Sequence, residues 1–136
     1  MREILFRGKW IDNGEWKEGI CIPCNDGSAM IGVGIAANTP IDETAMCITY
    51  SVDPETVGQY TGLTDRNGRK IFEGDILQYG EPPETSTYEV VFEAASFVVH
   101  SGFFRVALKE GLSERFQVIG NIYDNIDLLE GGESNA

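Results

Sequence analysis

The strongest constraint on the fold is the spacing of apolar residues, which alternate with polar residues in short runs. In the second half of the chain, such runs begin at Tyr88, Phe97, Phe104 and Phe116. A period of two sends successive side chains to opposite faces of a strand, so each run predicts a half-buried β-strand. Several short strands at this spacing predict a mainly β fold, built as a small barrel or a sandwich.

The first 22 residues predict a β-hairpin. Apolar side chains recur in Ile4 to Trp10 and again in Trp16 to Ile22. Between them lies Asp12-Asn13-Gly14, a strong hairpin turn because Asn and Gly accept positive φ angles.

The next segment is broken by glycines and prolines. We expect short strands at Met30 to Ile35 and Met46 to Val52, with a mobile loop at Ala36 to Thr44. Asp53 and Pro54 are typical of the N-cap and first position of a single helical turn.

The pattern becomes sharper from Val57. We expect a strand at Ile71 to Gln78 that is interrupted at Gly74-Asp75, then a polar loop at Gly80 to Thr87. A closing helical turn is expected at Tyr123 to Leu129. The predicted organisation is therefore an N-terminal hairpin region with an irregular segment (1–56), a barrel-like β domain (57–130) and a disordered tail (131–136).

Charge limits the classes of partner. Ten Lys and Arg residues stand against 22 Asp and Glu residues, and the formal net charge is −12. This charge opposes unaided binding to nucleic acid or anionic lipid and favours a basic protein partner. The longest mostly apolar stretch, Ala29 to Ala37, is far shorter than the roughly 20 residues of a membrane-spanning helix. The opening residues lack the pattern of a secretory signal, so we expect a cytoplasmic protein without a membrane partner.

The thiols form the first candidate site. Cys21 and Cys24 have the C-x-x-C spacing of zinc and redox motifs, and Cys47 with the single histidine, His100, would complete a set of four zinc ligands. Turn residues rather than an amphipathic helix follow Cys24, which argues against a thioredoxin-like site. In a reducing compartment we expect structural thiols and no bound cofactor, with a metal site as the alternative.

A second candidate is the basic turn from Asp65 to Lys70. It contains three of the ten basic residues, and two aromatic residues flank it. Small barrels bind single strands with such basic and aromatic surfaces. The alternative is a solvated hairpin tip, because turns need polar neighbours. The candidate binding residues are Tyr60, Arg66, Arg69, Lys70 and Phe72.

The third candidate is Glu73-Gly74-Asp75. In a regular strand, Glu73 and Asp75 would share one face and could bind a divalent ion or act as an acid and a base. We favour a structural turn at Gly74 and Asp75 in which the aspartate accepts backbone N–H bonds. No nucleophile–base pair or phosphate-binding loop is present in the sequence, and His100 and Ser101 would point to opposite faces of a strand. We therefore expect a protein that is not an enzyme.

Three segments resemble the signatures of one family, the YopX-like proteins of phages and prophages. They are Arg2 to Trp10, the stretch Val57 to Leu77 that contains GQYTGLTDRNGRKIFEGD, and Val118 to Asn125 with the sequence VIGNIYDN. The resemblance implies a bacterial cytoplasmic location, a β-rich fold and an SH3-like barrel in the C-terminal part. It implies no reaction, ligand or catalytic residue.

The leading hypothesis is a non-enzymatic phage or prophage accessory protein that binds a host or phage macromolecule. A homo-oligomer is expected, because small β domains often pair exposed strand edges and bury aromatic residues between copies. The alternatives are a nucleic-acid-binding module that uses the 60–72 region and a metal-dependent enzyme or metal-stabilised fold.

Overall fold

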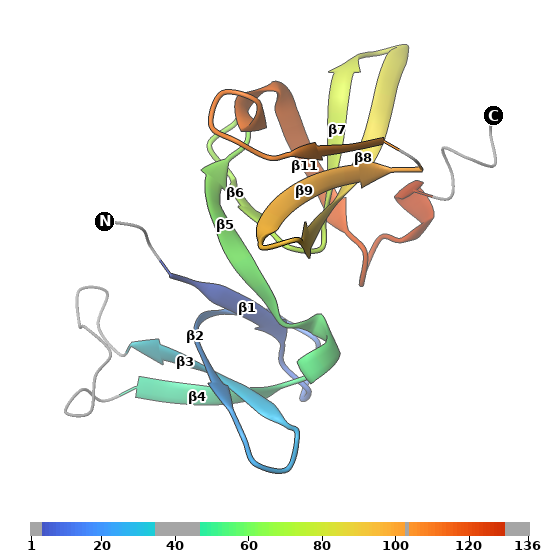
Figure 1. Cartoon of the computed structure of the whole chain (residues 1–136). Coiled ribbons are helices and arrows are strands. Elements are labelled where there is room, and N and C mark those ends of the chain that lie inside the picture. The colour runs from blue at the N-terminus through green and yellow to red at the C-terminus, as the bar shows by residue number, and fades with distance from the viewer. Residues whose placement is uncertain (1–3, 35–46, 103, 130–136) are drawn as a thin grey trace. The chain divides into compact units, whose positions relative to one another are not determined.

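The structure is a computed structural model that describes residues 4–34, 47–102 and 104–129 (Figure 1). The chain divides into two compact units, Met1–Tyr60 (unit 1) and Thr61–Ala136 (unit 2). It is mainly β, as predicted, with one six-stranded and one five-stranded antiparallel sheet. No helix in the described residues is long and apolar enough to cross a membrane.

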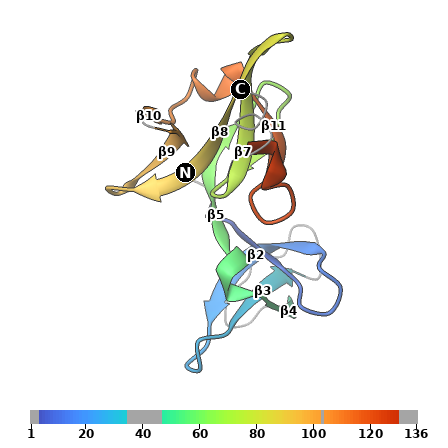
Figure 2. The same ribbon diagram turned by 90° about the vertical axis from the view of Figure 1, so that its right-hand side faces the viewer.

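Unit 1 is built on the predicted N-terminal hairpin (Figure 2). Its strands are β1 (Phe6–Lys9), β2 (Trp16–Pro23), β3 (Ala29–Gly34), β4 (Cys47–Val52) and the start of β5 (Gly58–Thr64). Phe6 pairs with Gly19 in β2 and with Gln59 in β5, so β1 lies between these two strands. The predicted strands around Met30 and Ile48 are confirmed as β3 and β4.

Side chains from β3 and β4 form the buried core of unit 1. Ala29, Ile31 and Val52 are buried, and Phe6 and Tyr50 are among the residues that pack against them. The predicted helical turn is confirmed as the 3-10 turn η1 (Pro54–Thr56), where the Asp53 carboxylate accepts a 3.0 Å hydrogen bond from the Glu55 N–H.

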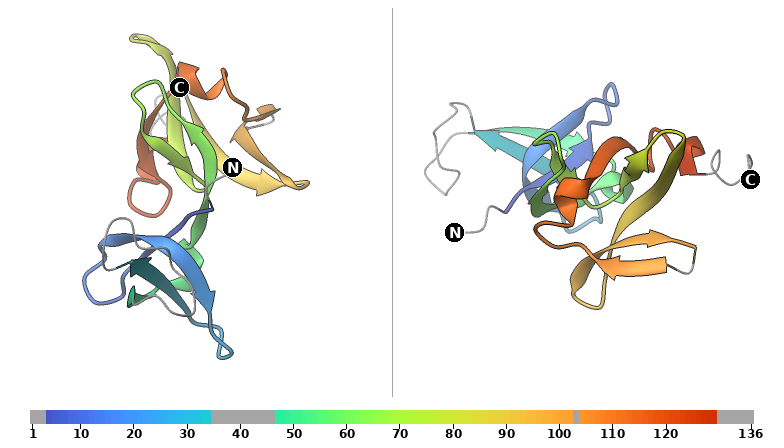
Figure 3. Two further views of the ribbon diagram at one scale, coloured as in Figure 1. Left: turned by 90° about the vertical axis from the view of Figure 1, so that its left-hand side faces the viewer. Right: turned by 90° about the horizontal axis from the view of Figure 1, so that it is seen from above.

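Unit 2 contains the five-stranded sheet, in the order β10-β9-β8-β7-β11. Figure 3 shows its strands coloured from yellow-green to red. Its elements are β6 (Lys70–Phe72), β7 (Asp75–Glu81), β8 (Glu84–Glu93), β9 (Ser96–Ser101), β10 (Phe104–Ala107), η2 (Ser113–Arg115) and β11 (Phe116–Asn121). Strand β6 pairs with β5 as the last strand of the six-stranded sheet. Residues 127–129 are helical, within the predicted closing turn.

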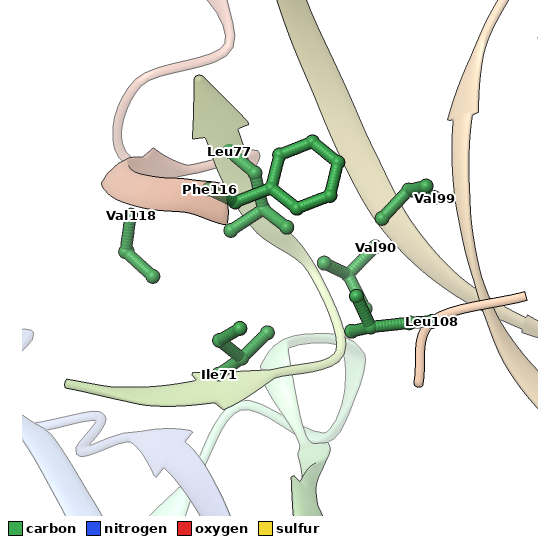
Figure 4. Packing of buried hydrophobic residues seen from close by; sticks show 7 residues of the cluster. All are labelled: Ile71, Leu77, Val90, Val99, Leu108, Phe116 and Val118. Atoms are coloured by element: carbon green, nitrogen blue, oxygen red, sulfur yellow. The ribbon is translucent and has the colours of Figure 1, made fainter. Parts of the chain in front are cut away.

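Seven buried side chains form the core of unit 2, and Figure 4 shows them converging from β6 to β11. Leu77, Val90 and Val99 come from three adjacent strands, and their alternation in the sequence places them on one face of the sheet. The others are Ile71, Leu108, Phe116 and Val118.

Two expectations differ from the structure. The strands close no barrel in the described residues, and the five-stranded sheet has two edges, β10 and β11. Gly80 to Thr87 is not a loop, because β7 and β8 pair up to Glu81 and Glu84 and only Pro82 and Pro83 form the turn. The prolines stay outside the ladder, and the β-branched Thr85 and Thr87 are well suited to a strand.

The division between the two units falls inside β5. The first residues of β5 pair with β1, so the ladder holds them in unit 1. The expected loop at Ala36 to Thr44 and the tail at 131–136 lie outside the described residues.

Candidate binding surface

Four aromatic side chains form a continuous row in unit 2, which we call the aromatic row. The ring centroids of Tyr79 and Phe116 are 5.5 Å apart, those of Phe116 and Tyr88 are 5.6 Å apart, and those of Tyr88 and Phe104 are 5.5 Å apart. These are favourable distances for inclined aromatic pairs. The row extends across the sheet from β11 to β10.

Strand register brings the four rings to one face. Phe116 is opposite Tyr79, and Tyr88 is opposite Leu77, two residues from Tyr79 on the same face of β7. Phe104 is opposite Ser101 in β9. Because the serine is small, the rings of Tyr88 and Phe104 meet across it although β9 separates their strands.

The row is buried in its middle and open at both ends. Phe116 is 3% exposed and belongs to the core, and Tyr88 is half-buried against that core. Tyr79 is 39% exposed and Phe104 is 52% exposed. Tyr79 is therefore held by the buried Phe116 and Phe104 by the half-buried Tyr88, which limits the side-chain entropy lost when a partner binds.

Carboxylates lie at the Tyr79 end of the row. Glu81 follows Tyr79 by two residues on the same strand, and Glu84 pairs with Glu81 across the hairpin. Both side chains are exposed, and Glu81 forms a 3.2 Å ion pair with Arg66. Exposed aromatic faces next to carboxylates suit a cationic side chain, above all arginine, through cation–π and ionic contacts.

The predicted basic turn does not provide a stacking platform. Tyr60 is 8% exposed and Phe72 is 2% exposed, so neither ring is available to a nucleobase. Arg66 is occupied, because it also donates a 2.8 Å hydrogen bond to Gln117. Arg69 and Lys70 are exposed at the tip.

Asp65 has a structural role in this turn. Its buried carboxylate accepts hydrogen bonds from the N–H groups of Asn67, Arg69 and Val118 at 2.8, 2.9 and 2.9 Å. The carboxylate therefore fixes the turn and attaches it to β11. Sequence reasoning placed Asp65 in the turn but missed this structural role.

Gly74 and Asp75 form the expected structural turn. Gly74 has a φ of 93°, and Asp75 accepts a 2.7 Å hydrogen bond from the Phe72 N–H. A Cβ atom on Gly74 would lie 3.1 Å from the Tyr123 ring. Asp75 is buried whereas Glu73 is half-buried before the strand begins, so the two do not form an exposed carboxylate pair.

The thiols belong to unit 1 and His100 to unit 2. Cys21 packs against the core of unit 1, and burial raises the pKa of its thiol. Cys24 contacts the carbonyl oxygen of Ile22 at 3.9 Å, and Cys47 pairs with Gly34 through its backbone in β4. In the part of the chain that the structure describes, no three His, Cys, Asp or Glu side chains form a metal-binding group.

His100 lies within a polar stripe on the other face of the unit 2 sheet. Its ring Nε2 is 2.9 Å from the carbonyl oxygen of Gly102, and its cross-strand neighbours are Glu89 and Arg105. Burial raises the pKa of Glu89, and the charge of His100 acts in the opposite direction. Ser101 lies on the opposite face, next to the aromatic row, so it does not pair with His100.

The aromatic row was missed because alternation alone does not distinguish core from surface. Each of the four residues is the apolar member of an alternating run, and the sequence assigned such residues to the core. One signal in the sequence could have indicated the row: the number of aromatic residues on the predicted inner face is larger than a small core can bury.

The fold and this surface define a small all-β protein of two sheet units with a partly exposed aromatic row. The chain belongs to the YopX family, whose model, described as YopX protein, matches residues 6–130. The family resemblance inferred from the three sequence segments is thereby confirmed.

One solved structure supports the same fold. The chain is similar to the crystal structure of protein EF1440 from Enterococcus faecalis, with 26% sequence identity and a TM-score of 0.62. The similarity covers 95% of this chain and 99% of that chain. No match to this chain was found among the curated proteins.

Proposed function

We propose that this YopX-family protein is a non-enzymatic accessory protein of a bacteriophage or prophage that binds a basic host or phage protein in the bacterial cytoplasm. The aromatic row is the observation that carries the proposal. Its exposed ends, Tyr79 and Phe104, pack on the buried Phe116 and the half-buried Tyr88, and the carboxylates of Glu81 and Glu84 lie at one end.

Charge supports a basic partner. The net charge of −12 attracts a cationic protein over several ångströms and accelerates its encounter with the surface. At contact, an arginine of the partner can stack on Phe104 or Tyr79 and bind Glu81 or Glu84. Aromatic residues are enriched at the centres of protein interfaces, which agrees with this use of the row.

Nucleic acid matches the surface less well. Phosphates would meet the carboxylates of Glu81 and Glu84 beside Tyr79, and the buried rings of Tyr60 and Phe72 cannot stack on bases. Arg66, the cation at the Tyr79 end of the row, is already paired with Glu81, so it contributes little to binding a nucleic-acid backbone.

The test is affinity capture from a bacterial lysate with three immobilised proteins. The wild type is compared with the double variant Tyr79→Ser/Phe104→Ser and with Phe92→Ser. Phe92 is a matched control, because it is also 52% exposed on the same sheet but pairs with Phe97 rather than with the aromatic row.

We expect the wild type and Phe92→Ser to retain the same basic protein, eluted by moderate salt, and the double variant to lose it. Recovery of an acidic partner, equal recovery by the double variant, or no reproducible partner would refute the proposal. Single-stranded oligonucleotide retained by the wild type and lost on replacing Arg66, Arg69 and Lys70 would favour the nucleic-acid alternative instead.

A further inference from the structure

The two edges of the sheet in unit 2 differ. The β11 edge is covered, because the Arg66 N–H bonds to the Phe116 carbonyl oxygen at 3.0 Å and the Val118 N–H bonds to Asp65. Strand β10 (Phe104–Ala107) forms the other edge, and in the described residues no strand pairs with its outer side (Figure 2).

The hydrogen-bond pattern shows which groups of β10 face outward. The Leu108 N–H bonds to the Phe97 carbonyl oxygen at 2.9 Å, and Val106 is opposite Val99 in the same register. Antiparallel ladders alternate, so the N–H and C=O groups of Arg105 and Ala107 point away from β9. They can accept a further strand.

Side chains on β10 define what such a strand would contain. On one face, Phe104 and Val106 are 52% and 37% exposed and extend the aromatic row to the edge. These side chains would pack against apolar residues of an added strand.

The opposite face of the edge is polar and carries more negative than positive charge. Arg105 is opposite His100, which is opposite Glu89, and Arg105 forms a 2.7 Å ion pair with Glu93. On the edge strand itself, the charge of Arg105 is neutralised by its ion pair with Glu93. The preference for basic side chains on an added strand therefore comes from the net charge of −12.

We propose that β10 is a strand-addition site for an extended segment of the basic partner, in which apolar residues alternate with lysine or arginine. The inference rests on the proposed function and names the binding mode. Apolar side chains pack on Phe104 and Val106, basic side chains lie on the polar face, and the backbone bonds to Arg105 and Ala107. Strand addition of this kind combines main-chain affinity with side-chain specificity.

The test uses the full chain and a ten-residue peptide in which lysine and valine alternate. Amide hydrogen exchange is followed by NMR with and without the peptide. We expect exchange at the Arg105 and Ala107 amides to slow by about tenfold or more at saturation, as new hydrogen bonds form. The Val106 amide, which faces β9, serves as the internal reference.

Two variants at one position separate backbone pairing from side-chain contact. Ala107→Pro removes the outward N–H, whereas Ala107→Thr retains it and suits a strand. We expect Ala107→Pro to weaken peptide binding about tenfold and Ala107→Thr to change it less than about twofold. If Ala107→Pro fails to fold, the exchange measurement on the wild type still tests whether the peptide pairs with the backbone of β10.

Several results would overturn strand addition. They are peptide binding without protection at Arg105 and Ala107, equal binding by Ala107→Pro, equal binding of a peptide with glutamate in place of lysine, and no saturable binding of the lysine peptide. The proposed function is judged separately, because the capture experiment depends on Tyr79 and Phe104 and not on the outward N–H groups.

Discussion

The buried carboxylate of Asp65 accepts a 2.9 Å hydrogen bond from the backbone N–H of Val118, 53 residues further along the chain. The same carboxylate bonds to two N–H groups in its own turn. A single side chain thus stabilises a hairpin tip and closes the edge of the five-stranded sheet against further pairing.

Replacing Asp65 with alanine should destabilise unit 2. Three N–H groups lose their acceptor, and because the bond to Val118 is buried we expect a loss of about 3 kcal/mol in the free energy of unfolding. Urea unfolding, monitored by amide hydrogen exchange at Val118, measures the loss in free energy of unfolding. Asp26→Ala, which removes an exposed turn aspartate bonded to Ser28, is the control and should cost much less. Equal losses in the two variants would contradict the structural role.

Asp75→Ala should also lower stability without creating or removing an ion site. The Phe72 N–H would lose its 2.7 Å bond to a buried carboxylate, at a cost of about 2 kcal/mol. Thermal unfolding monitored by circular dichroism gives the change. Neither Ca²⁺ nor Mg²⁺ should raise the melting temperature of the wild type. A rise that disappears in Asp75→Ala would support the divalent-ion alternative.

Lys17 should stabilise unit 1 through its contacts with two aromatic rings. Its ammonium nitrogen lies 4.8 Å from the centre of the Trp10 ring and 4.3 Å from that of Tyr50. We expect Lys17→Gln to cost about 1 kcal/mol. Both tryptophans of the chain are in unit 1, so tryptophan fluorescence during urea unfolding detects the loss. Glu15→Gln, which removes the 3.1 Å ion pair with Lys17 but keeps the ammonium group, is the control in the same unit. An equal loss in both variants would count against the cation–π contact.

Glu89 should make the stability of unit 2 depend on pH. Burial raises the pKa of its carboxyl in the folded state. A raised pKa means that the contribution of Glu89 to stability is complete below the unfolded value of about 4.3 and is lost as the pH rises through the folded value.

Glu89→Gln removes this dependence, because glutamine does not ionise. Relative to the wild type, the variant should therefore gain stability as the pH rises from about 4.3 through the raised pKa of Glu89. Urea unfolding at a series of pH values tests this. A stability difference that stays constant over that range would show that burial of the Glu89 carboxylate is not the cause.

Self-association remains a prediction from the exposed strand edges and aromatic residues. Light scattering should report a multiple of the 15.0 kDa chain mass at working concentration. A mass of 15.0 kDa would refute the homo-oligomer, and it would leave binding of a partner strand at β10 unaffected.

Much of the local structure was predictable. Asn13-Gly14 and Asp65 to Gly68 were expected turns, because positive φ and Asx hydrogen bonds are encoded in single residues. Gly74 and Asp75 were expected to form a structural turn for the same reason. The end of the β7–β8 hairpin was predicted as a loop, because Gly80 to Thr87 is polar and contains two prolines. In the structure this part of β8 is held by its pairing with β7.

The candidate site was predictable only in part. The sequence directed attention to Tyr60 and Phe72 beside a basic turn, and packing buries both rings. The aromatic row lies elsewhere, because it needs Phe116 and Phe104 to reach Tyr88 from strands on either side. Those contacts depend on strand order and on the small side chain of Ser101, which a linear pattern does not contain.

The sequence by itself determined the strands, most of the turns, the acidic surface and the family, because each follows from neighbouring residues or from composition. Only the tertiary structure decided which aromatic rings stay exposed and which sheet edge stays open. Both depend on segments distant in the chain: Phe116 supports Tyr79 and Tyr88 from β11, and Asp65 closes the β11 edge while β10 has no such cover in the described residues. Burial and edge protection are properties of the packed chain. Alternation along a strand determines only which residues share a face, and tertiary packing determines which of the two faces is buried.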